Sequence, residues 1–350
     1  MDNTYSPLVS VLIPVYQVER YIERCARSVF EQTYHNCEFV FVDDGCTDSS
    51  IVLLGRTIDE YPHVKNSVII IKHEHNKGLS ATRNTAINSC HGEFVIHVDS
   101  DDWIEPDAIS LLVKRQQETD ADIVYTKGYY LQKEGTTKIN CQGWSSEKKA
   151  LLINLLQDKA TISIWSKLIK KSLYTDYGIE CVESADYYED FQVLPRLIYF
   201  AKKIACIDDF IYHYNRSNPN SIVTNISRSI SIQKQGMLSI HNICNFFQNK
   251  DELLYSSVKS FYVRYLYRML SLNFNNSNKK GYYEFLHLLK RTDRREWQMI
   301  GWHRLLNRVI DNNYYIKVFT FPLYKKMLHL RRKIIHSFQN QDKPIIVLSF

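Results

Sequence analysis

Short apolar segments alternate with amphipathic segments along the first 130 residues of the chain. The apolar segments are continuous, as expected for strands that are buried on both faces of a sheet. We expect strands at residues 9–15, 38–42, 68–71, 94–98 and 122–125. Apolar residues at helical spacing predict helices between them, at residues 18–32, 47–61, 79–89 and 106–118. This alternation predicts an α/β domain with a doubly wound, mostly parallel sheet.

The pattern changes after this region. Residues 130–225 are less regular, with a turn-rich stretch at 132–144 and helices expected near 147–157 and 190–201. From about residue 226, few strand signals remain, and the chain is rich in Tyr, Leu, Arg and Lys. We therefore expect one domain over residues 1–225, with halves that meet near residue 125, and a helical C-terminal region over residues 226–350.

The charges are distributed unevenly. The chain has 44 Lys and Arg against 38 Asp and Glu, a net charge of +6, which is too mild to indicate a nucleic-acid partner. Residues 253–338 hold 17 basic and four acidic residues, so the rest of the chain is net acidic. Basic and aromatic residues at helical spacing over residues 314–338 fit an anionic membrane surface. A helix that packs on the domain and exposes its basic face fits equally well.

The cysteine pattern and the apolar runs bear on location. Eight cysteines form no Cys-x-x-Cys pair and have no histidine at zinc spacing, which favours reduced thiols in a cytoplasmic protein. The N-terminal segment has no basic region before an apolar core, and no apolar run reaches the roughly 18–20 residues of a membrane span. We expect a cytoplasmic protein, either free or peripheral on the inner face of the cell membrane.

Polar clusters follow the expected strands at the edge where open parallel sheets bind ligands. Asp43-Asp44-Gly45 follows the second strand, residues 76–84 (NKGLSATRN) open the third helix, and Asp99-Ser100-Asp101-Asp102 ends the fourth strand. Two acidic clusters at neighbouring strand ends repel each other unless a cation or hydrogen-bond donor groups lie between them. Asp99 and Asp101 leave their strand as alternate residues and can converge on one hard cation such as Mg²⁺ or Mn²⁺. Taken alone, this acidic run would equally fit a solvated turn.

Taken together, three ordered segments resemble the family 2 glycosyltransferases with the GT-A fold. The segments are residues 9–50, residues 76–84 (NKGLSATRN) and residues 92–109 (GEFVIHVDSDDWIEPDAI). The resemblance is strong over residues 8–125 and looser to about residue 225. It implies a GT-A domain whose nucleotide-sugar half spans about 1–125 and whose acceptor half spans about 126–225. It also implies a nucleotide-diphosphosugar donor, a divalent metal ion and inverting transfer.

The resemblance assigns donor-binding roles to five residues. Pro14 and Tyr16 match the segment that lines the nucleobase pocket in the family. Asp44 matches the acid that hydrogen-bonds the uracil ring, and Asp43 beside it is expected to brace the loop. Arg83 matches a position near the diphosphate.

The resemblance also implies the metal ligands. Asp101 is expected to contact Mn²⁺ or Mg²⁺ directly, Asp99 to contact the metal or the ribose, and Asp102 to support them. His213 stands where some relatives supply a third metal or phosphate contact, although a lone histidine is more often structural. Arg216, in the same segment, is a candidate contact to the diphosphate.

Inverting transfer needs a carboxylate that takes the acceptor's proton and a cation that holds the leaving diphosphate. Because the metal ligands are occupied, the base must be a separate acid. Glu189-Asp190 resembles the Glu-Asp motif of the family, in which the aspartate is the base. Acids also favour the first turn of any helix, so this assignment depends on the resemblance. Trp165 precedes this motif, as in the family, and fits a sugar-stacking or a buried position.

These observations predict a metal-dependent inverting glycosyltransferase. It would move a hexose or N-acetylhexosamine from a UDP-sugar to a saccharide acceptor, expected to be lipid-linked, in capsule, exopolysaccharide or O-antigen synthesis. A sugar-phosphate nucleotidylyltransferase is the alternative enzyme, but it would show a glycine-rich loop where residues 14–18 read PVYQV. A non-enzymatic nucleic-acid binder that uses the basic region would leave the acidic motifs without a role, and we expect no nucleic-acid partner.

Overall fold

The computed structural model describes residues 5–141, 143–219, 221, 229–275 and 278–291. The chain divides into two compact units, Met1–Tyr282 and Tyr283–Phe350. The described part of the second unit is the C-terminal portion of helix α11 (Lys279–Arg291). All other elements described below belong to the first unit.

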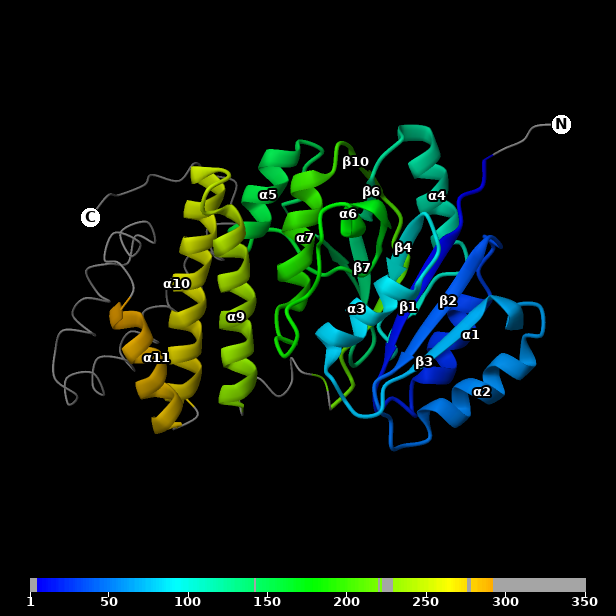
Figure 1. The fold of residues 1–350 in the computed structure, drawn as a ribbon, viewed down its shortest axis with the longest axis horizontal. Coiled ribbons are helices and arrows are strands. Elements are labelled where there is room, and N and C mark those ends of the chain that lie inside the picture. Colours follow the sequence, from blue (N-terminus) through cyan, green and yellow to red (C-terminus); the bar gives the residue numbers. More distant parts are fainter. Residues whose placement is uncertain (1–4, 142, 220, 222–228, 276–277, 292–350) are drawn as a thin grey trace. The chain divides into compact units, whose positions relative to one another are not determined.

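A seven-stranded sheet forms the centre of the first unit (Figure 1), in the order β10-β6-β9-β4-β1-β2-β3. All neighbouring strands are parallel except β9 (Lys167–Lys170), which is antiparallel to both β4 and β6. The doubly wound, mostly parallel sheet is therefore confirmed. The five expected strands lie within one residue of their predicted ends: β1 (Val9–Val15), β2 (Cys37–Asp43), β3 (Val68–Lys72), β4 (Phe94–His97) and β6 (Ile123–Thr126).

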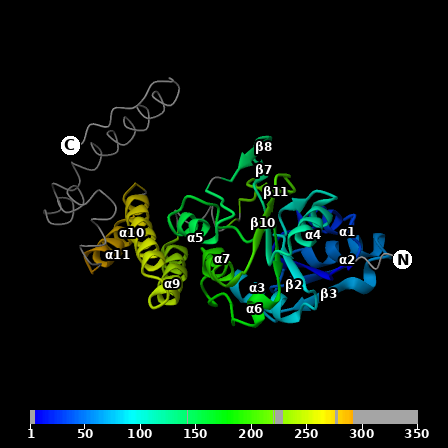
Figure 2. The same ribbon diagram turned by 90° about the horizontal axis from the view of Figure 1, so that it is seen from above.

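Helices cover both faces of this sheet, with α1 (Ile22–Phe30) and α4 (Ala108–Thr119) on one face and α3 (Leu79–Ser89) on the other (Figure 2). Alternate residues of β1 point to opposite faces, because side chains alternate along a strand. Its odd-numbered residues join the apolar cluster beneath α1 and α4: Val9, Val11, Ile13 and Val15. Burial on both faces explains why this strand is a continuous apolar run.

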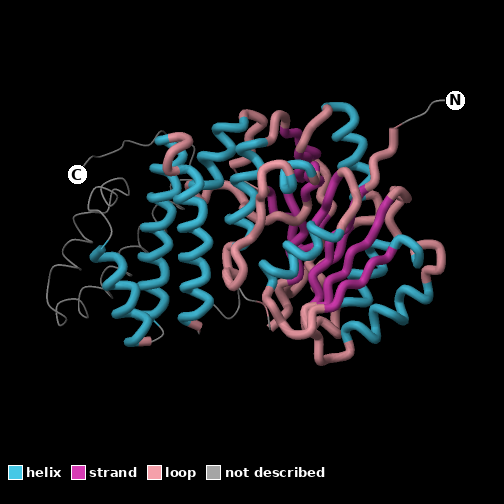
Figure 3. Tube along the Cα trace, viewed as in Figure 1, coloured by secondary structure: helices cyan, strands magenta, loops and turns pink. Residues whose placement is uncertain are grey.

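The remaining expected helices are also present. They are α2 (Ser50–Glu60), α5 (Lys148–Leu156) and α7 (Glu189–Phe200), and a short helix that the sequence did not indicate, α6 (Ser172–Thr175), precedes α7. After residue 228 the described chain is helical, with α9 (Ile230–Phe247) and α10 (Glu252–Asn275) before α11 (Figure 3). Helix α9 packs against α7 and α10, and α10 also contacts α5. Within the described segments, no helix combines the length and apolar character needed to cross a membrane.

A second, four-stranded sheet was not indicated by the sequence. Its order is β5-β11-β7-β8, and its strands are β5 (Trp103–Ile104), β11 (Tyr212–Asn215), β7 (Gly128–Gln132) and β8 (Thr136–Asn140). The stretch 132–144, expected as turns, contains β8, which is exposed along most of its length. The strand β10 (Ile204–Ile207) of the main sheet was also missed. These strands are short, and most pair with segments far away in the chain, so local patterns indicate them weakly.

Two expectations about the C-terminal half are not tested by the structure. Residues 222–228, around the expected domain boundary, lie outside the described residues, as does the basic segment 314–350. The division near residue 225 and the membrane contact of the basic segment therefore stay predictions.

Candidate active site

A cavity of about 550 Å³ lies at the carboxyl ends of the central strands. Because β1 lies between β2 and β4, the polar residues that follow these three strands reach the same place. The N-terminus of α3 and the segment that opens α7 complete the walls. Seven of the predicted site residues line this cavity: Pro14, Tyr16, Asp44, Asp99, Asp101, Glu189 and Asp190.

Asp44 joins the end of β2 to the loop that opens α3. Its carboxylate accepts hydrogen bonds from the backbone N–H groups of Lys77, at 2.8 Å, and Gly78, at 3.0 Å. The Nδ1 atom of His73 lies 2.7 Å from Asp44 Oδ1. Gly78 has φ +93°, a conformation that favours glycine. Asp44 thus shapes this wall while it also faces the cavity.

Asp43, Pro14 and Tyr16 surround the same strand ends. Asp43 is buried and accepts a hydrogen bond from the backbone N–H of Cys46 at 2.7 Å, so it braces its own loop. Pro14 and Tyr16 come from the end of β1, and Tyr16 is 46% exposed. An exposed aromatic ring at the cavity mouth is suited to contact a flat ligand.

Arg83 lies beside this cavity and is the centre of a charged network with three acids that line it. Its guanidinium lies 2.9 Å from Asp99 Oδ1 and 3.0 Å from Glu189 Oε1, and it also contacts the carboxylate of Asp190. The Arg83 side chain is only 4% exposed, against 26%, 12% and 14% for these three partners in the same order. Arg83 therefore joins the acid that follows β4 to the two acids that open α7.

Burial and charge oppose each other in this network. Burial lowers the pKa of Arg83, but Asp190, Asp99 and Glu189 raise it by more, so the guanidinium stays charged. Burial, together with the neighbouring Asp190, raises the pKa of Glu189 to about 8, although Arg83 opposes the shift. Burial also raises the pKa of Asp190, again against Arg83. The two acids of α7 therefore hold protons more readily than exposed carboxyl groups do.

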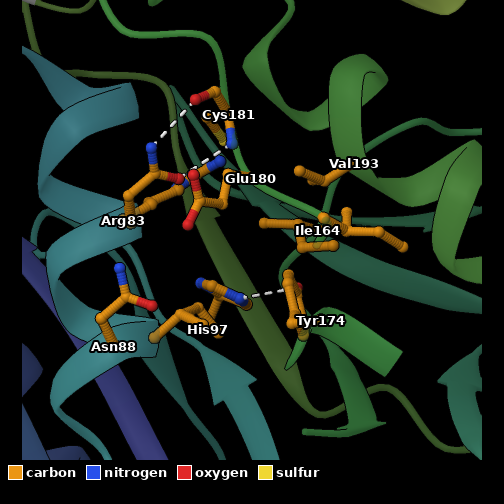
Figure 4. A pocket seen from close by; sticks show the side chains of 11 residues that line it. Arg83, Asn88, His97, Ile164, Tyr174, Glu180, Cys181 and Val193 are labelled. Atoms are coloured by element: carbon orange, nitrogen blue, oxygen red, sulfur yellow. Dashed lines mark hydrogen bonds between the residues drawn. The ribbon is translucent and has the colours of Figure 1, made fainter. Parts of the chain in front are cut away.

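The far side of Arg83 is enclosed by side chains from α3, β4 and the chain before α7 (Figure 4). The Asn84 side chain exchanges two hydrogen bonds with the backbone of Cys181, at 2.8 and 2.9 Å. His97 Nε2 lies 3.1 Å from the hydroxyl of Tyr174, and burial, with a contribution from Arg83, lowers the pKa of His97 to about 3. His97 is therefore neutral and adds no positive charge beside Arg83.

The acidic run after β4 is fixed by residues of β11 and the chain that follows it. Asn218 donates to Asp101 Oδ2 at 2.8 Å. Tyr212 donates its hydroxyl hydrogen to Asp102 Oδ2 at 2.7 Å and accepts from the N–H of Asp99 at 3.1 Å. Asp102 is fully buried and therefore supports the run from behind, whereas Asp99 and Asp101 line the cavity.

The chemistry of this run fits a divalent cation. Burial raises the pKa of Asp101 to about 6, and the nearby Asp99 adds to the shift. A cation between Asp99 and Asp101 would relieve this unfavourable concentration of negative charge. Within the described residues, no three or more His, Cys, Asp or Glu side chains form a complete metal site. Two carboxylates suit Mg²⁺ or Mn²⁺, which commonly take further ligands from substrate phosphates and water.

The structure does not bring His213 into this cavity. Its Nε2 lies 2.7 Å from Glu105 Oε1, and its Nδ1 lies 3.0 Å from Gln132 Nε2. Its ring stacks on Trp103 and Tyr130, with ring centroids 4.7 and 4.6 Å away. Both ring nitrogens thus have side-chain partners, Gln132 at the end of β7 and Glu105 directly after β5, and the structure gives no support to a metal contact here. Arg216, which is exposed, is likewise absent from the cavity lining.

Trp165 is part of an aromatic wall of the cavity. It is only 7% exposed and stacks on Tyr212 and Tyr214, with centroids 4.4 and 5.6 Å away. Trp165 and Tyr214 both line the cavity. The buried Lys167 donates from Nζ to the carbonyl oxygen of Trp165 at 3.2 Å, which fixes this turn. Trp165 is thus mainly a packed residue that shows part of its surface to the cavity.

Four functional residues were not singled out from the sequence. Asn218 and Tyr212 hold the acidic run, His73 contacts Asp44, and Asp186 lines the cavity. His73 directly follows β3, so its position after a strand was an available signal. The other three act through partners about 106–117 residues away, which no local pattern indicates.

Comparisons with known proteins show the family of the chain. The family model described as "Glycosyl transferase family 2" matches residues 10–178. Glycosyltransferase GlyA of Streptococcus pneumoniae serotype 4 is 33% identical over 217 residues, which cover 59% of this chain and 30% of that protein. The putative glycosyltransferase EpsH of Bacillus subtilis (strain 168) is 30% identical over 256 residues, 71% of each chain. Poly(ribitol-phosphate) beta-glucosyltransferase of Bacillus spizizenii is 31% identical over 210 residues, with 59% of this chain and 32% of that protein covered. The chain thus spans about a third of the length of two of these relatives and most of the length of EpsH.

Two solved structures share the fold. Residues 1–349 of S. aureus TarS, in complex with UDP-GlcNAc, superpose with a TM-score of 0.62 at 17% identity, covering 85% of this chain and 87% of that chain. The mannosyltransferase PcManGT from Pyrobaculum calidifontis, in complex with GDP-Man and Mn²⁺, gives a TM-score of 0.53 at 15% identity, with 87% and 81% covered. The predicted GT-A fold is therefore confirmed.

Proposed function

The chain belongs to glycosyltransferase family 2, and we propose that it transfers a hexose or N-acetylhexosamine from a UDP-sugar to a saccharide hydroxyl, with inversion and with a divalent metal ion. One observation carries the proposal, namely that two acidic groups line a single cavity and are joined by the buried Arg83 beside it. Asp99 and Asp101 follow β4, whereas Glu189 and Asp190 open α7. This arrangement supports a single displacement, which requires one group of residues that stabilises the leaving group and a separate group that supplies the base.

The donor side is proposed at the strand ends. Pro14 and Tyr16 would contact the nucleobase, and Asp44 would accept a hydrogen bond from it while it holds the loop before α3. Asp99 and Asp101 would hold Mn²⁺ or Mg²⁺, which supplies positive charge to the leaving diphosphate. The complexes of TarS with UDP-GlcNAc and of PcManGT with GDP-Man and Mn²⁺ support a nucleotide-sugar and a metal ion for this fold.

The base is proposed to be Asp190, with Glu189 beside it. The bond from the acceptor oxygen to the anomeric carbon forms as the bond to the diphosphate breaks, and Asp190 takes the proton of the acceptor hydroxyl. Burial raises the pKa of Asp190 and makes it a better proton acceptor than an exposed aspartate, while Arg83 opposes its premature protonation. Arg83 thus acts on the base as well as on Asp99, rather than only near the diphosphate as the sequence predicted.

The acceptor is proposed to be a saccharide that is part of a growing, lipid-linked polymer. Trp165 and Tyr214 would contact its ring on the acceptor side of the cavity. The similarity to a poly(ribitol-phosphate) beta-glucosyltransferase supports a polymeric acceptor. We further propose a cytoplasmic protein that is peripheral on the membrane through residues 314–350. Flotation with acidic liposomes, with and without this segment, would test that contact, and equal binding would refute it.

Asp190→Asn tests the assignment of the base. The variant should bind UDP in the presence of Mn²⁺ as the wild type does, but its turnover should fall by roughly 10²–10⁴-fold, the usual contribution of a general base. Asp209→Asn is the matched control, because Asp209 is exposed and is not among the residues that line the cavity. Near-normal turnover by Asp190→Asn would show that another group takes the proton.

A further inference from the structure

Residues 185–188, here called the base strap, come directly before Glu189 and Asp190. Asp186, Tyr187 and Tyr188 of the strap line the cavity together with the two acids. Tyr188 has φ 63° and ψ 28°, a left-handed conformation that is costly for a residue other than glycine. Contacts from outside the strap must therefore hold it in this shape.

Helix α9 supplies polar contacts to the strap. Ser239 donates its hydroxyl hydrogen to the carbonyl oxygen of Tyr187 at 2.7 Å. Gln235 Oε1 accepts from the N–H of Asp186 at 3.2 Å. Gln192, from α7, donates to Ser239 Oγ at 2.9 Å and thereby joins the two helices. Ser239 and Gln192 are fully buried, so these bonds are shielded from competing water.

Helix α10 supplies two aromatic side chains, Phe261 and Tyr265, which pack against Tyr188 and are here called the seat for Tyr188. The Tyr188 ring meets Phe261 and Tyr265 edge to face, with centroids 5.7 and 5.6 Å away. Phe261 also stacks on Phe191, one residue beyond Asp190, at 4.5 Å. Arg268 Nη1 lies 3.3 Å from the hydroxyl of Tyr188. The seat thus contacts the chain on both sides of the two acids.

Gly236 permits the close approach of α9 to this seat. A Cβ atom at this position would lie 2.4 Å from Tyr265 Oη and 2.8 Å from Tyr187 Cδ1. Both distances are far below a normal contact, so a side chain at position 236 would have to push Tyr187 or Tyr265 away. The glycine is therefore a packing requirement of the strap.

The other side of the strap is attached to α3, which carries Arg83. Asp186 Oδ1 accepts from the N–H of Ser80 at 2.8 Å, and Ser80 Oγ donates to the carbonyl oxygen of Ala185 at 2.9 Å. The strap is thus fixed between the helix that carries Arg83 and the pair α9–α10.

We propose that α9 and α10 are positioning elements of the active site, which hold the base strap so that Asp190 faces Arg83 and the acceptor. This inference rests on the proposed function, because it takes Asp190 as the base. The helices act through Ser239, Gly236 and the seat for Tyr188, and none of these needs to touch a substrate. The donor residues Asp44 and Asp101 receive their own contacts from the loop before α3 and from Asn218, so donor binding should not depend on α9.

The test compares Ser239→Ala and Gly236→Ala with two matched controls. Ser231→Ala makes the same change at an exposed position of α9, and Gly55→Ala makes the same change in helix α2, where a Cβ meets open space. Hydrogen–deuterium exchange of residues 185–190 should accelerate about tenfold or more in the two test variants, while the amides of β1 keep their protection. In steady-state assays, kcat for transfer should fall by a similar factor, with UDP affinity within about twofold of the wild type.

Each outcome decides the inference. Unchanged exchange over residues 185–190 in Ser239→Ala would overturn it, as would normal exchange together with normal kcat in Gly236→Ala. A parallel loss of UDP affinity and of protection throughout the sheet would also overturn it, because this would indicate a general loss of stability. If Gly236→Ala does not fold, Ser239→Ala decides. If the wild type transfers no sugar, the proposed function fails, but the exchange comparison still tests whether α9 holds the strap.

Discussion

Replacing Arg83 by methionine tests the charged network at the centre of the site. The substitution keeps the apolar stem but removes the guanidinium that contacts Asp99, Glu189 and Asp190. Removing one partner of a buried ion pair typically costs about 3–5 kcal/mol, because the remaining charge is buried without compensation. The side chains of Glu189 and Asp190 are only 12% and 14% exposed, so water replaces the guanidinium poorly. We therefore expect a loss of about 3–5 kcal/mol in the free energy of unfolding at pH 8.

The size of this loss should depend on pH. Burial already raises the pKa of Glu189 and Asp190, and Arg83 lowers both. Without Arg83 the folded-state pKa values rise further above those of the unfolded chain. At a pH between the unfolded-state pKa and the folded-state pKa of these carboxyl groups, the folded variant keeps protons that the unfolded chain has lost. The free energy of unfolding of the variant therefore falls as the pH rises. At pH 5 Glu189 holds its proton, and Asp190 holds a proton more readily than at pH 8, so less buried negative charge is left without the guanidinium and the loss should be smaller than at pH 8.

Urea unfolding followed by tryptophan fluorescence at pH 5, 6.5 and 8 measures this dependence. Arg27→Met is the matched control, because Arg27 pairs with Glu60 on the surface, where the side chains are 38% and 51% exposed. Surface pairs contribute little, so the control should match the wild type at every pH. Equal losses for Arg83→Met at pH 5 and pH 8, or a loss below about 1 kcal/mol at pH 8, would refute the reasoning.

Two further predictions concern single carboxylates. Glu189→Gln keeps an oxygen that can accept from Arg83 but removes a group whose pKa is raised to about 8 by burial. The free energy of unfolding of the wild type should fall between about pH 5 and 8, by on the order of 1 kcal/mol per pH unit, because the folded state retains this proton and the unfolded chain does not. Melting curves recorded across this pH range should show no such decline for the variant. Parallel pH dependence of the wild type and the variant would contradict this prediction. Asp44→Asn turns one acceptor into a donor facing the N–H groups of Lys77 and Gly78. It should lose about 1–3 kcal/mol of stability, with weaker UDP binding by calorimetry, and unchanged values of both would contradict this.

The side of the site at the ends of β1, β2 and β4 could be predicted because its signals are local. The strands β1, β2 and β4 are continuous apolar runs, and the acids follow them directly in the sequence. Once these strands are taken as parallel, Asp44, Asp99 and Asp101 must meet at one edge of the sheet, and they do. Helix α3 was predicted at its observed bounds, because its ends and its apolar spacing are also local features.

The other side could not be predicted in the same way, because its contacts join distant segments. Arg83 pairs with acids 106 and 107 residues away, so no local pattern indicated this pairing, and the resemblance assigned Arg83 only a position near the diphosphate. The strand β9 has four residues and is defined by two antiparallel partners, which local periodicity does not reveal. His213 was a candidate metal or phosphate contact because it stands where some relatives supply one. Its partners Glu105 and Gln132 come from elsewhere in the chain, so no local pattern indicated its structural role.

The C-terminal helices show the same limit at a larger scale. The pattern after residue 226 predicts helices but not what they contact. Their contacts with the base strap depend on Gly236, which a sequence presents only as a weak helix former. The close approach of Tyr187 and Tyr265 explains why a residue without a side chain is needed at this position.

Release of UDP from a UDP-sugar tests the central claim most directly. The wild type should release UDP from at least one UDP-hexose or UDP-N-acetylhexosamine in the presence of Mn²⁺, and chelation of the metal should stop this release. Asp101→Ala should lower the rate by about 100-fold or more, because it removes a proposed ligand of the ion that stabilises the leaving diphosphate. Release that persists after chelation, or that proceeds at the wild-type rate in Asp101→Ala, would contradict metal-dependent transfer at this site.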